Sequence, residues 1–165
     1  LDTPGGAVLL NVFGGKLTTY RRLAEDAVDQ LAPELGNQGK AWTGKGHPLP
    51  GGEEAKPQHL FESLQASHPF IPLGMANRLV FNYGTRVRDI VEGAKSLEDL
   101  GEHFGADLYA AEVDYLRDHE WARTAEDILW RRSKLGLRLD DDQCQRLADY
   151  LARSSDGPTK AEPEI

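Results

Sequence analysis

The chain has 165 residues, a formal net charge of −8 and a single cysteine, Cys144. The acidic balance disfavours nucleic-acid binding, because phosphate backbones attract basic surfaces. One cysteine excludes both an internal disulfide and a CxxC metal knuckle. No apolar run approaches the ~20 residues that a membrane-spanning helix needs. Because the chain begins with Leu1 rather than Met, we expect a piece of a longer protein.

The first predicted unit is a strand, a glycine turn and a helix. Residues 7–13 are rich in Val, Leu and Phe and predict a strand that stops at Gly14-Gly15. Thr18 or Thr19 is the expected N-cap of the helix that follows, and Pro33 and Gly36 should end it. Six apolar or small residues of this helix share one face at a 3.6-residue period: Tyr20, Leu23, Ala24, Ala27, Val28 and Leu31.

The remainder predicts a helical domain behind a linker. We assign residues 1–38 to the strand-turn-helix unit, 39–54 to a linker rich in Gly and Pro, 55–153 to the helical domain and 154–165 to a polar tail. We expect no strand beyond the linker, so the fold class is mostly α. The expected helices are 57–67, 72–83, 86–94, 107–119, 124–135 and 140–153.

Helix-end signals support two of these boundaries. Thr124 with Asp127, and Asp140 with Gln143, are capping boxes that predict helix starts. A basic cluster before Gly136 suits the negative end of a helix dipole; its members are Arg131, Arg132 and Lys134.

Several catalytic and metal motifs fail on spacing. A nucleotide P-loop ending at Gly15-Lys16 would need glycine where Leu10 stands and a hydroxyl where Leu17 stands. His119-Glu120 lacks the second histidine of a zinc-protease helix, because Arg123 holds that position. The aspartates at 140–142 lack the alternating ligands of a calcium loop. We expect no metal site, and we expect the scattered histidines and Cys144 to be structural.

The Gly14-Gly15-Lys16 turn can be interpreted in two ways. Glycines let a flat ligand approach the backbone, and a helix N-terminus with Lys16 attracts negative charge, so the turn suits a phosphate or the pyrimidine edge of a flavin. Alternatively, the glycines only make a tight turn and Lys16 is solvated. The residues by themselves leave both interpretations open.

The amino-acid sequences of several stretches resemble those of one protein family. "NVFGGKLTTYRRLAEDAV" is similar to a signature of the FAD-dependent glycerol-3-phosphate dehydrogenases, near the C-terminal end of their flavin-binding domain. Three later stretches, "PLPGG", "RLVFNYGTR" and "HEWARTAEDILWRRSKLG", resemble the helical C-terminal domain of that family in order and spacing. The resemblance covers nearly the whole chain apart from the tail. Glycerol-3-phosphate oxidases carry similar segments.

The resemblance implies a cofactor and a reaction. It implies that FAD lies against the turn formed by Gly14, Gly15, Lys16, Leu17 and Thr18, and that Lys16 has a catalytic role beside flavin and substrate. The implied reaction oxidises sn-glycerol 3-phosphate to dihydroxyacetone phosphate by hydride transfer to the flavin. Electrons then pass to a quinone, or to oxygen in an oxidase. The implied setting is cytoplasmic; a homodimer and peripheral membrane association stay open.

The chain also lacks parts that the family needs. No G-x-G-x-x-G fingerprint for FAD is present, and the base histidine and most phosphate-binding arginines of the family have no counterpart here. We therefore expect this chain alone to be colourless and inactive, with no regular sheet in residues 1–15. A helical interaction or dimerisation module without a catalytic role is the alternative function; a DNA-binding helical domain is disfavoured by the acidic balance.

Overall fold

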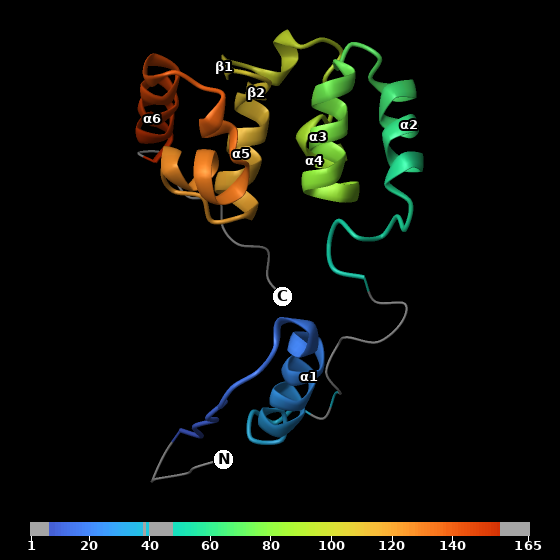
Figure 1. Cartoon of the computed structure of the whole chain (residues 1–165), viewed down its shortest axis with the longest axis vertical. Helices are drawn as coiled ribbons and strands as arrows, with labels where there is room; N and C mark the ends of the chain where they lie inside the picture. The colour runs from blue at the N-terminus through green and yellow to red at the C-terminus, as the bar shows by residue number, and fades with distance from the viewer. Residues whose placement is uncertain (1–6, 38, 40–47, 156–165) are drawn as a thin grey trace. The chain divides into compact units, whose positions relative to one another are not determined.

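The structure is a computed structural model that describes residues 7–37, 39 and 48–155 (Figure 1). The chain divides into two compact units, Leu1–Leu49 and Pro50–Ile165, which are described separately below. Residues 40–47, which are half of the expected linker, and residues 156–165 of the expected tail lie outside the described residues. The predicted fold class is confirmed, because the described residues are mostly helical.

The first unit contains the predicted helix. The helix α1 spans Tyr20–Leu31 and follows a 3-10 turn at Leu17–Thr19. No residue of α1 is buried, and Leu23 and Val28 on its apolar face are 37% and 48% exposed. The apolar face predicted from the 3.6-residue period is present, and its side chains are largely exposed in the part of the chain that the structure describes.

The prediction of a strand at residues 7–13 is wrong. Only Leu9 has the bridge geometry of a strand residue, and the described part of this unit contains no sheet. The physical reason is that a strand needs a neighbouring backbone to satisfy its amides and carbonyls. The expectation that residues 7–15 would lack a regular sheet is confirmed.

The second unit is a helical domain. Its longer helices are α2 at Pro57–Ser67, α3 at Leu73–Tyr83, α5 at Ala110–His119 and α6 at Asp141–Ser155. The helices α2 and α3 lie side by side (Figure 1). The short helix α4 at Val87–Ile90 continues from a 3-10 turn at Gly84–Arg86. Two further 3-10 turns lie at Glu98–Leu100 and Leu135–Leu137.

Two segments differ from the expected pattern. Residues 103–109 form a small antiparallel hairpin, β1 at His103–Gly105 and β2 at Leu108–Tyr109, where no strand was expected. The hairpin also delays the start of the expected 107–119 helix to Ala110. It is held by burial, because Phe104 and Leu108 are each 0% exposed, and strands this short carry almost no alternation to detect in sequence.

The second difference is a change of helix type. Residues Asp127–Arg132 form a π-helix rather than an α-helix, and the amide of Ser133 bonds the carbonyl of Ile128 at 3.0 Å, five residues back. The expected 86–94 helix is also shorter, because α4 ends at Ile90.

One hydrophobic core holds the second unit together. It draws side chains from every long helix and from the hairpin, including Leu79, Leu116, Ile128 and Leu147 at 0% exposure. The first unit has nothing comparable, since Ala32 is its only buried apolar residue among those described. The second unit therefore has its own source of stability, whereas the described part of the first unit leaves most of its apolar side chains exposed.

Candidate functional site

The glycine-lysine turn adopts a conformation that requires glycine. Gly14 and Gly15 have φ values of +79° and +132°, and Lys16 then enters the 3-10 turn with an extended backbone. No atom lies within 4 Å of a Cβ added to Gly14, so its surface is open to an approaching molecule. A Cβ on Gly15 would lie 3.3 Å from Cδ2 of Leu23. The turn is open at Gly14 and packed against α1 at Gly15.

The helix start uses Thr19 differently from a conventional N-cap. The hydroxyl of Thr19 donates to the carbonyl of Lys16 at 3.1 Å and accepts from the Lys16 amide at 3.4 Å. The amide of Thr19 donates to the same carbonyl at 2.9 Å. Thr19 does occupy the N-cap of α1, as one of the two predicted positions, but its side chain closes the turn on Lys16. The side chains of Lys16, Leu17 and Thr18 are exposed.

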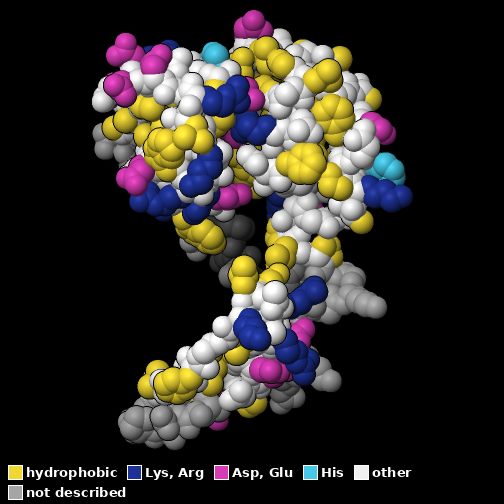
Figure 2. Space-filling model, in the orientation of Figure 1, with side chains coloured by type: hydrophobic (Ala, Val, Ile, Leu, Met, Phe, Trp, Pro, Cys, Tyr) yellow, Lys and Arg dark blue, Asp and Glu magenta, His cyan; other side chains and the backbone are white. Residues whose placement is uncertain are grey.

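Apolar side chains flank this turn. Phe13 and Leu17, on either side of it, are 93% and 88% exposed. A hollow of about 240 Å³ lies between residues 10–13 and α1, and Asp26 lines it together with apolar side chains that include Phe13 and Leu23. Figure 2 shows apolar side chains on the surface of this unit. The turn thus combines an open backbone at Gly14, an exposed lysine and exposed apolar side chains, a combination that a flat anionic ligand could use.

The second unit carries a larger cleft that the sequence did not reveal. Its volume is about 520 Å³. It is lined by Pro50, Asn82, Tyr83, Arg86, Tyr115, His119, Glu120, Trp121 and Arg132. These residues come from the three stretches quoted above from the helical part, together with Tyr115 of α5. Basic and apolar side chains stand next to one another on the face of this unit seen in Figure 2.

One wall of the cleft depends on two glycines in contact. The amide of Thr85 donates to the carbonyl of Gly51 at 2.9 Å. A Cβ on Gly84, whose φ is +55°, would lie 1.9 Å from that carbonyl oxygen. The hydroxyl of Thr85 also donates to the carboxylate of Glu53, which lowers the pKa of Glu53. The "PLPGG" turn is thereby fixed to the end of α3, and this places Pro50 at the cleft.

A buried ionic network includes Tyr83, which is one of the residues that line the cleft. Arg78 of α3 donates to both carboxylate oxygens of Glu112 at 2.6 and 2.8 Å, and the Tyr83 hydroxyl donates to Glu112 at 2.6 Å. Glu112 is 1% exposed. Burial opposes the charged form of Arg78, yet Glu112 and Asp107 raise its pKa, so it stays protonated. Burial and then Glu112 raise the pKa of Tyr83, so its phenol stays neutral.

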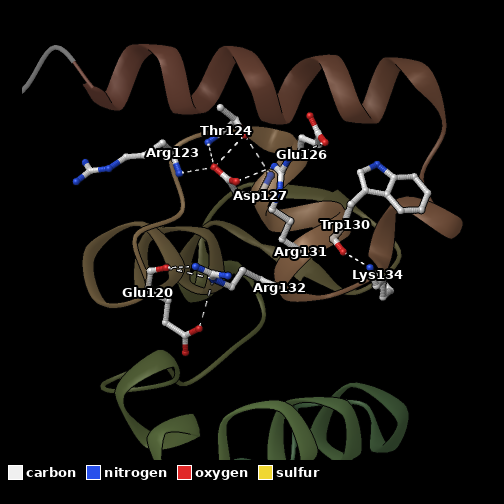
Figure 3. A network of polar contacts seen from close by, with 9 residues as sticks. All are labelled: Glu120, Arg123, Thr124, Glu126, Asp127, Trp130, Arg131, Arg132 and Lys134. Carbon is white, nitrogen blue, oxygen red and sulfur yellow. Dashed lines mark hydrogen bonds and ion pairs between the residues drawn. The ribbon is translucent and has the colours of Figure 1, made fainter. Parts of the chain in front are cut away.

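The far wall is the end of α5. The chain leaves this helix through Trp121, whose φ of +56° is rare for a residue with a side chain. This turn lets the amide of Ala122 donate to the carbonyl of Leu116 at 3.1 Å, while the indole of Trp121 stays 78% exposed. Arg132 donates two hydrogen bonds to the Glu120 carbonyl at 3.1 and 2.7 Å (Figure 3). Arg132 thus satisfies the C-terminal end of α5 and fixes this rim.

The predicted cap at Thr124 is confirmed. The carboxylate of Asp127 accepts from the amides of Arg123 and Thr124, both at 2.9 Å, and the Asp127 amide donates to the Thr124 hydroxyl at 3.1 Å (Figure 3). These amide bonds, the first of them from Arg123, hold the pKa of Asp127 well below its usual range. The predicted cap at Asp140 and Gln143 is confirmed by reciprocal bonds of 2.8 and 3.0 Å.

The basic cluster behaves only partly as predicted. Lys134 donates to the carbonyl of Trp130, so it satisfies a carbonyl near the C-terminal end of the helical segment, as predicted. Arg131 instead reaches back to Asp127 at 2.8 Å and Glu126 at 2.9 Å. Gly136 is needed because a Cβ there would lie 2.5 Å from the indole of Trp130.

The described residues contain no group of three His, Cys, Asp or Glu side chains that could hold a metal ion. Burial raises the pKa of the Cys144 thiol, followed in effect by Asp141 and Asp140, so the thiol is no activated nucleophile. His47 lies outside the described residues. Among the described helices, none is long and apolar enough to cross a membrane.

Fold and surface together define a helical domain with its own core and a basic, aromatic cleft, preceded by a unit that lacks a core. The chain belongs to the family described as the C-terminal domain of alpha-glycerophosphate oxidase, whose sequence model matches residues 43–155.

Curated relatives extend the similarity beyond that domain. The chain is 54% identical over 148 residues to a glycerol-3-phosphate dehydrogenase of Pseudomonas aeruginosa, covering 89% of this chain and 29% of that relative. It is 44% identical over 151 residues to the aerobic glycerol-3-phosphate dehydrogenase of Escherichia coli, covering 91% and 30%. It is also 47% identical over 153 residues to a D-erythritol 1-phosphate dehydrogenase of Brucella abortus, covering 92% and 30%. The chain thus spans under a third of the length of these relatives.

Proposed function

We propose that this chain is the C-terminal part of an FAD-dependent glycerol-3-phosphate dehydrogenase. The observation that carries the proposal is the turn at Gly14, Gly15 and Lys16, which is open, cationic and placed at the start of a helix. The similarity to glycerol-3-phosphate dehydrogenases over about nine-tenths of the chain supports it. The uncovered apolar face of α1 supports it too, since this unit then belongs to a larger domain.

The turn fits the edge of a flavin. The residues that would hold FAD are Gly14, Gly15, Lys16, Leu17 and Thr18. The open space at Gly14 admits a flat ring close to the backbone, which any Cβ would hinder. When bound, FAD supplies the acceptor for the hydride that leaves the substrate. This chain does not itself carry the dinucleotide fingerprint, so the rest of the FAD site lies in the other part of the enzyme.

Lys16 is the residue of this chain that acts in the reaction. Its ammonium is exposed beside the turn and carries a full positive charge. There it stabilises the negative charge that develops on the substrate oxygen as its proton leaves, and it orients the anionic substrate. A fixed cation at the point where charge develops lowers the barrier of the chemical step more than it strengthens binding of the ground state.

For the substrate and for the electron acceptor, we consider one alternative each. The Brucella relative acts on a four-carbon polyol phosphate by its name, so D-erythritol 1-phosphate is the second candidate substrate. The higher identity to the Pseudomonas dehydrogenase favours glycerol 3-phosphate. We place a quinone as acceptor, with peripheral association at the inner face of the cytoplasmic membrane; oxygen is the alternative. Two further hypotheses are that the enzyme is a homodimer, and that the helical unit serves only in dimerisation or protein binding.

The test uses the complete polypeptide, in which this chain is joined to its upstream part. The complete polypeptide should purify yellow, and glycerol 3-phosphate should bleach its flavin without oxygen. D-erythritol 1-phosphate should bleach it with a lower kcat/KM. The 165-residue chain alone should be colourless. A complete polypeptide that binds no flavin, or a flavin that glycerol 3-phosphate cannot reduce, would overturn the proposal.

A further inference from the structure

The cleft of the second unit contains side chains that the fold does not need. The core of this unit is complete without Trp121, which is 78% exposed. Arg86 is half exposed, and it forms an ion pair with the equally exposed Asp89 at 3.1 Å. An exposed indole and an exposed guanidinium contribute little to the stability of the unit.

Trp121 even opposes the stability of the unit. A positive φ places its Cβ close to neighbouring backbone, and glycine would adopt this conformation without that cost. A strained residue with an exposed side chain is commonly found at functional sites. The strain at Trp121 therefore indicates a task for the indole outside the folding of this unit.

The chemistry of the cleft is that of a protein-binding surface. Trp, Tyr and Arg are the residues enriched in the centres of protein interfaces, and Trp121, Tyr115, Arg86 and Arg132 meet here. The surface is also held rigid in advance. Gly51 is fixed to Thr85, and Arg132 is fixed to the carbonyl of Glu120. A preformed surface loses little entropy on binding.

We propose that this cleft docks the upstream part of the same polypeptide, the part that the proposed function implies and on which this inference rests. The relatives are more than three times as long as the matched region, so a large partner exists within the polypeptide. The docked segment carries a carboxylate or carbonyl oxygen for Arg86, and an apolar side chain for the indole of Trp121. The helical unit then holds the catalytic part through a rigid, aromatic contact.

Hydrogen exchange tests this docking directly. The complete polypeptide is compared with the 165-residue chain, and peptides covering residues 115–122 and 82–86 are followed. Both regions should exchange at least tenfold more slowly in the complete polypeptide. Trp121→Ala in the complete polypeptide should abolish most of this protection. Phe81→Ala, which removes an aromatic side chain that is 70% exposed and does not line the cleft, should leave it intact.

Several results would overturn the docking. Equal exchange of the cleft in both proteins would do so, as would equal effects of Trp121→Ala and Phe81→Ala. Protection that appears in the 165-residue chain with rising concentration would assign the cleft to a second copy. Protection of the isolated chain by inorganic phosphate would assign it to a small anion.

The readout is independent of the proposed activity. If the complete polypeptide fails to oxidise glycerol 3-phosphate while its cleft is still protected, the docking stands and the proposed reaction fails. If the flavin is reduced normally while the cleft exchanges freely, the reaction stands and the docking fails.

Discussion

The guanidinium of Arg78 and the carboxylate of Glu112 form a paired set of hydrogen bonds, at 2.6 and 2.8 Å, inside the helical unit. Arg78 comes from α3 and Glu112 from α5, so the pair ties together the helices that carry the two walls of the cleft. Tyr83 adds a third bond to the same carboxylate. A buried ion pair is weak evidence for net stability, but the loss of one partner from it is strongly destabilising.

Glu112→Ala should unfold the helical unit far more easily. It removes the carboxylate that accepts two hydrogen bonds from the buried guanidinium of Arg78, which keeps its contact with Asp107 at 3.2 Å, and it removes the acceptor of the Tyr83 hydroxyl. We expect a loss of about 3–5 kcal/mol in the free energy of unfolding, measured by urea titration. Glu92→Ala, at an exposed position, should change it by less than about 0.5 kcal/mol. A loss for Glu112→Ala as small as that of the control would contradict the structure of this network.

Substitution by alanine should have opposite effects on the free energy of unfolding at Gly84, which follows α3, and at Gly74 within α3. Gly84→Ala places a Cβ against the carbonyl oxygen of Gly51 and should cost about 3 kcal/mol or more, since strain and steric overlap add. Gly74→Ala, inside the first turn of α3 with no atom within 4 Å of the new Cβ, should stabilise by up to about 1 kcal/mol. The midpoints of urea unfolding measure both. Equal effects would mean that the "PLPGG" turn does not sit on the end of α3.

Trp121→Gly should stabilise the 165-residue chain. Glycine removes the steric cost of the left-handed backbone, and the exposed indole contributes little packing, so we expect a gain of about 1 kcal/mol. Ala106→Gly, at φ +52° in the hairpin turn, is the matched control for a left-handed position without an exposed ring. A destabilised Trp121→Gly variant would show that the indole holds the fold together, which contradicts its assignment to docking.

Asp127→Asn should change how the stability of the chain depends on pH at acid pH. The pKa of Asp127 is depressed in the folded chain by bonds from the amides of Arg123 and Thr124. Its stabilising effect is therefore complete above the unfolded value of about 3.9, and it is lost as pH falls through the folded pKa. The Tm of the parent chain should exceed that of Asp127→Asn at neutral pH, and the gap should close as pH falls below about 4.

The control for this cap is Glu126→Gln, which removes the other carboxylate that Arg131 contacts. Its Tm should follow that of the parent chain across the same pH range. A gap between the parent and Asp127→Asn that stays constant down to low pH would show that the carboxylate charge is not what caps this helix.

The helices were predictable because their local signals agree with their packing. The caps at Thr124 and Asp140 and the periodicity of Tyr20–Leu31 act within a few residues, and the structure contains all three. The hairpin at residues 103–109 was not predictable, because burial of Phe104 and Leu108 by distant helices stabilises it. The π-helix at Asp127–Arg132 likewise has no signature in periodicity.

One part of the candidate site could likewise be predicted from the sequence, and another part could not. The turn at Gly14-Gly15 could be found from sequence, because adjacent glycines at an element boundary indicate positive φ, and both glycines adopt it. The cleft could not, since Arg86, Trp121 and Arg132 are separated in sequence and meet only through the fold. The available signal was that the stretches resembling one family contain exposed aromatic and basic residues. The contact between Gly51 and Gly84, which brings Pro50 to the cleft, has no signature in the sequence either.

The most direct measurement is the rate at which glycerol 3-phosphate reduces the flavin of the complete polypeptide, followed by anaerobic stopped flow. Lys16→Ala should slow this step by about 10²–10³-fold, the usual effect of removing one group that stabilises developing charge. The flavin content and Tm should be retained. Lys56→Ala, at an exposed lysine of the second unit, should reduce at the parent rate. Reduction of Lys16→Ala at the parent rate would contradict the assignment of this turn to the active site.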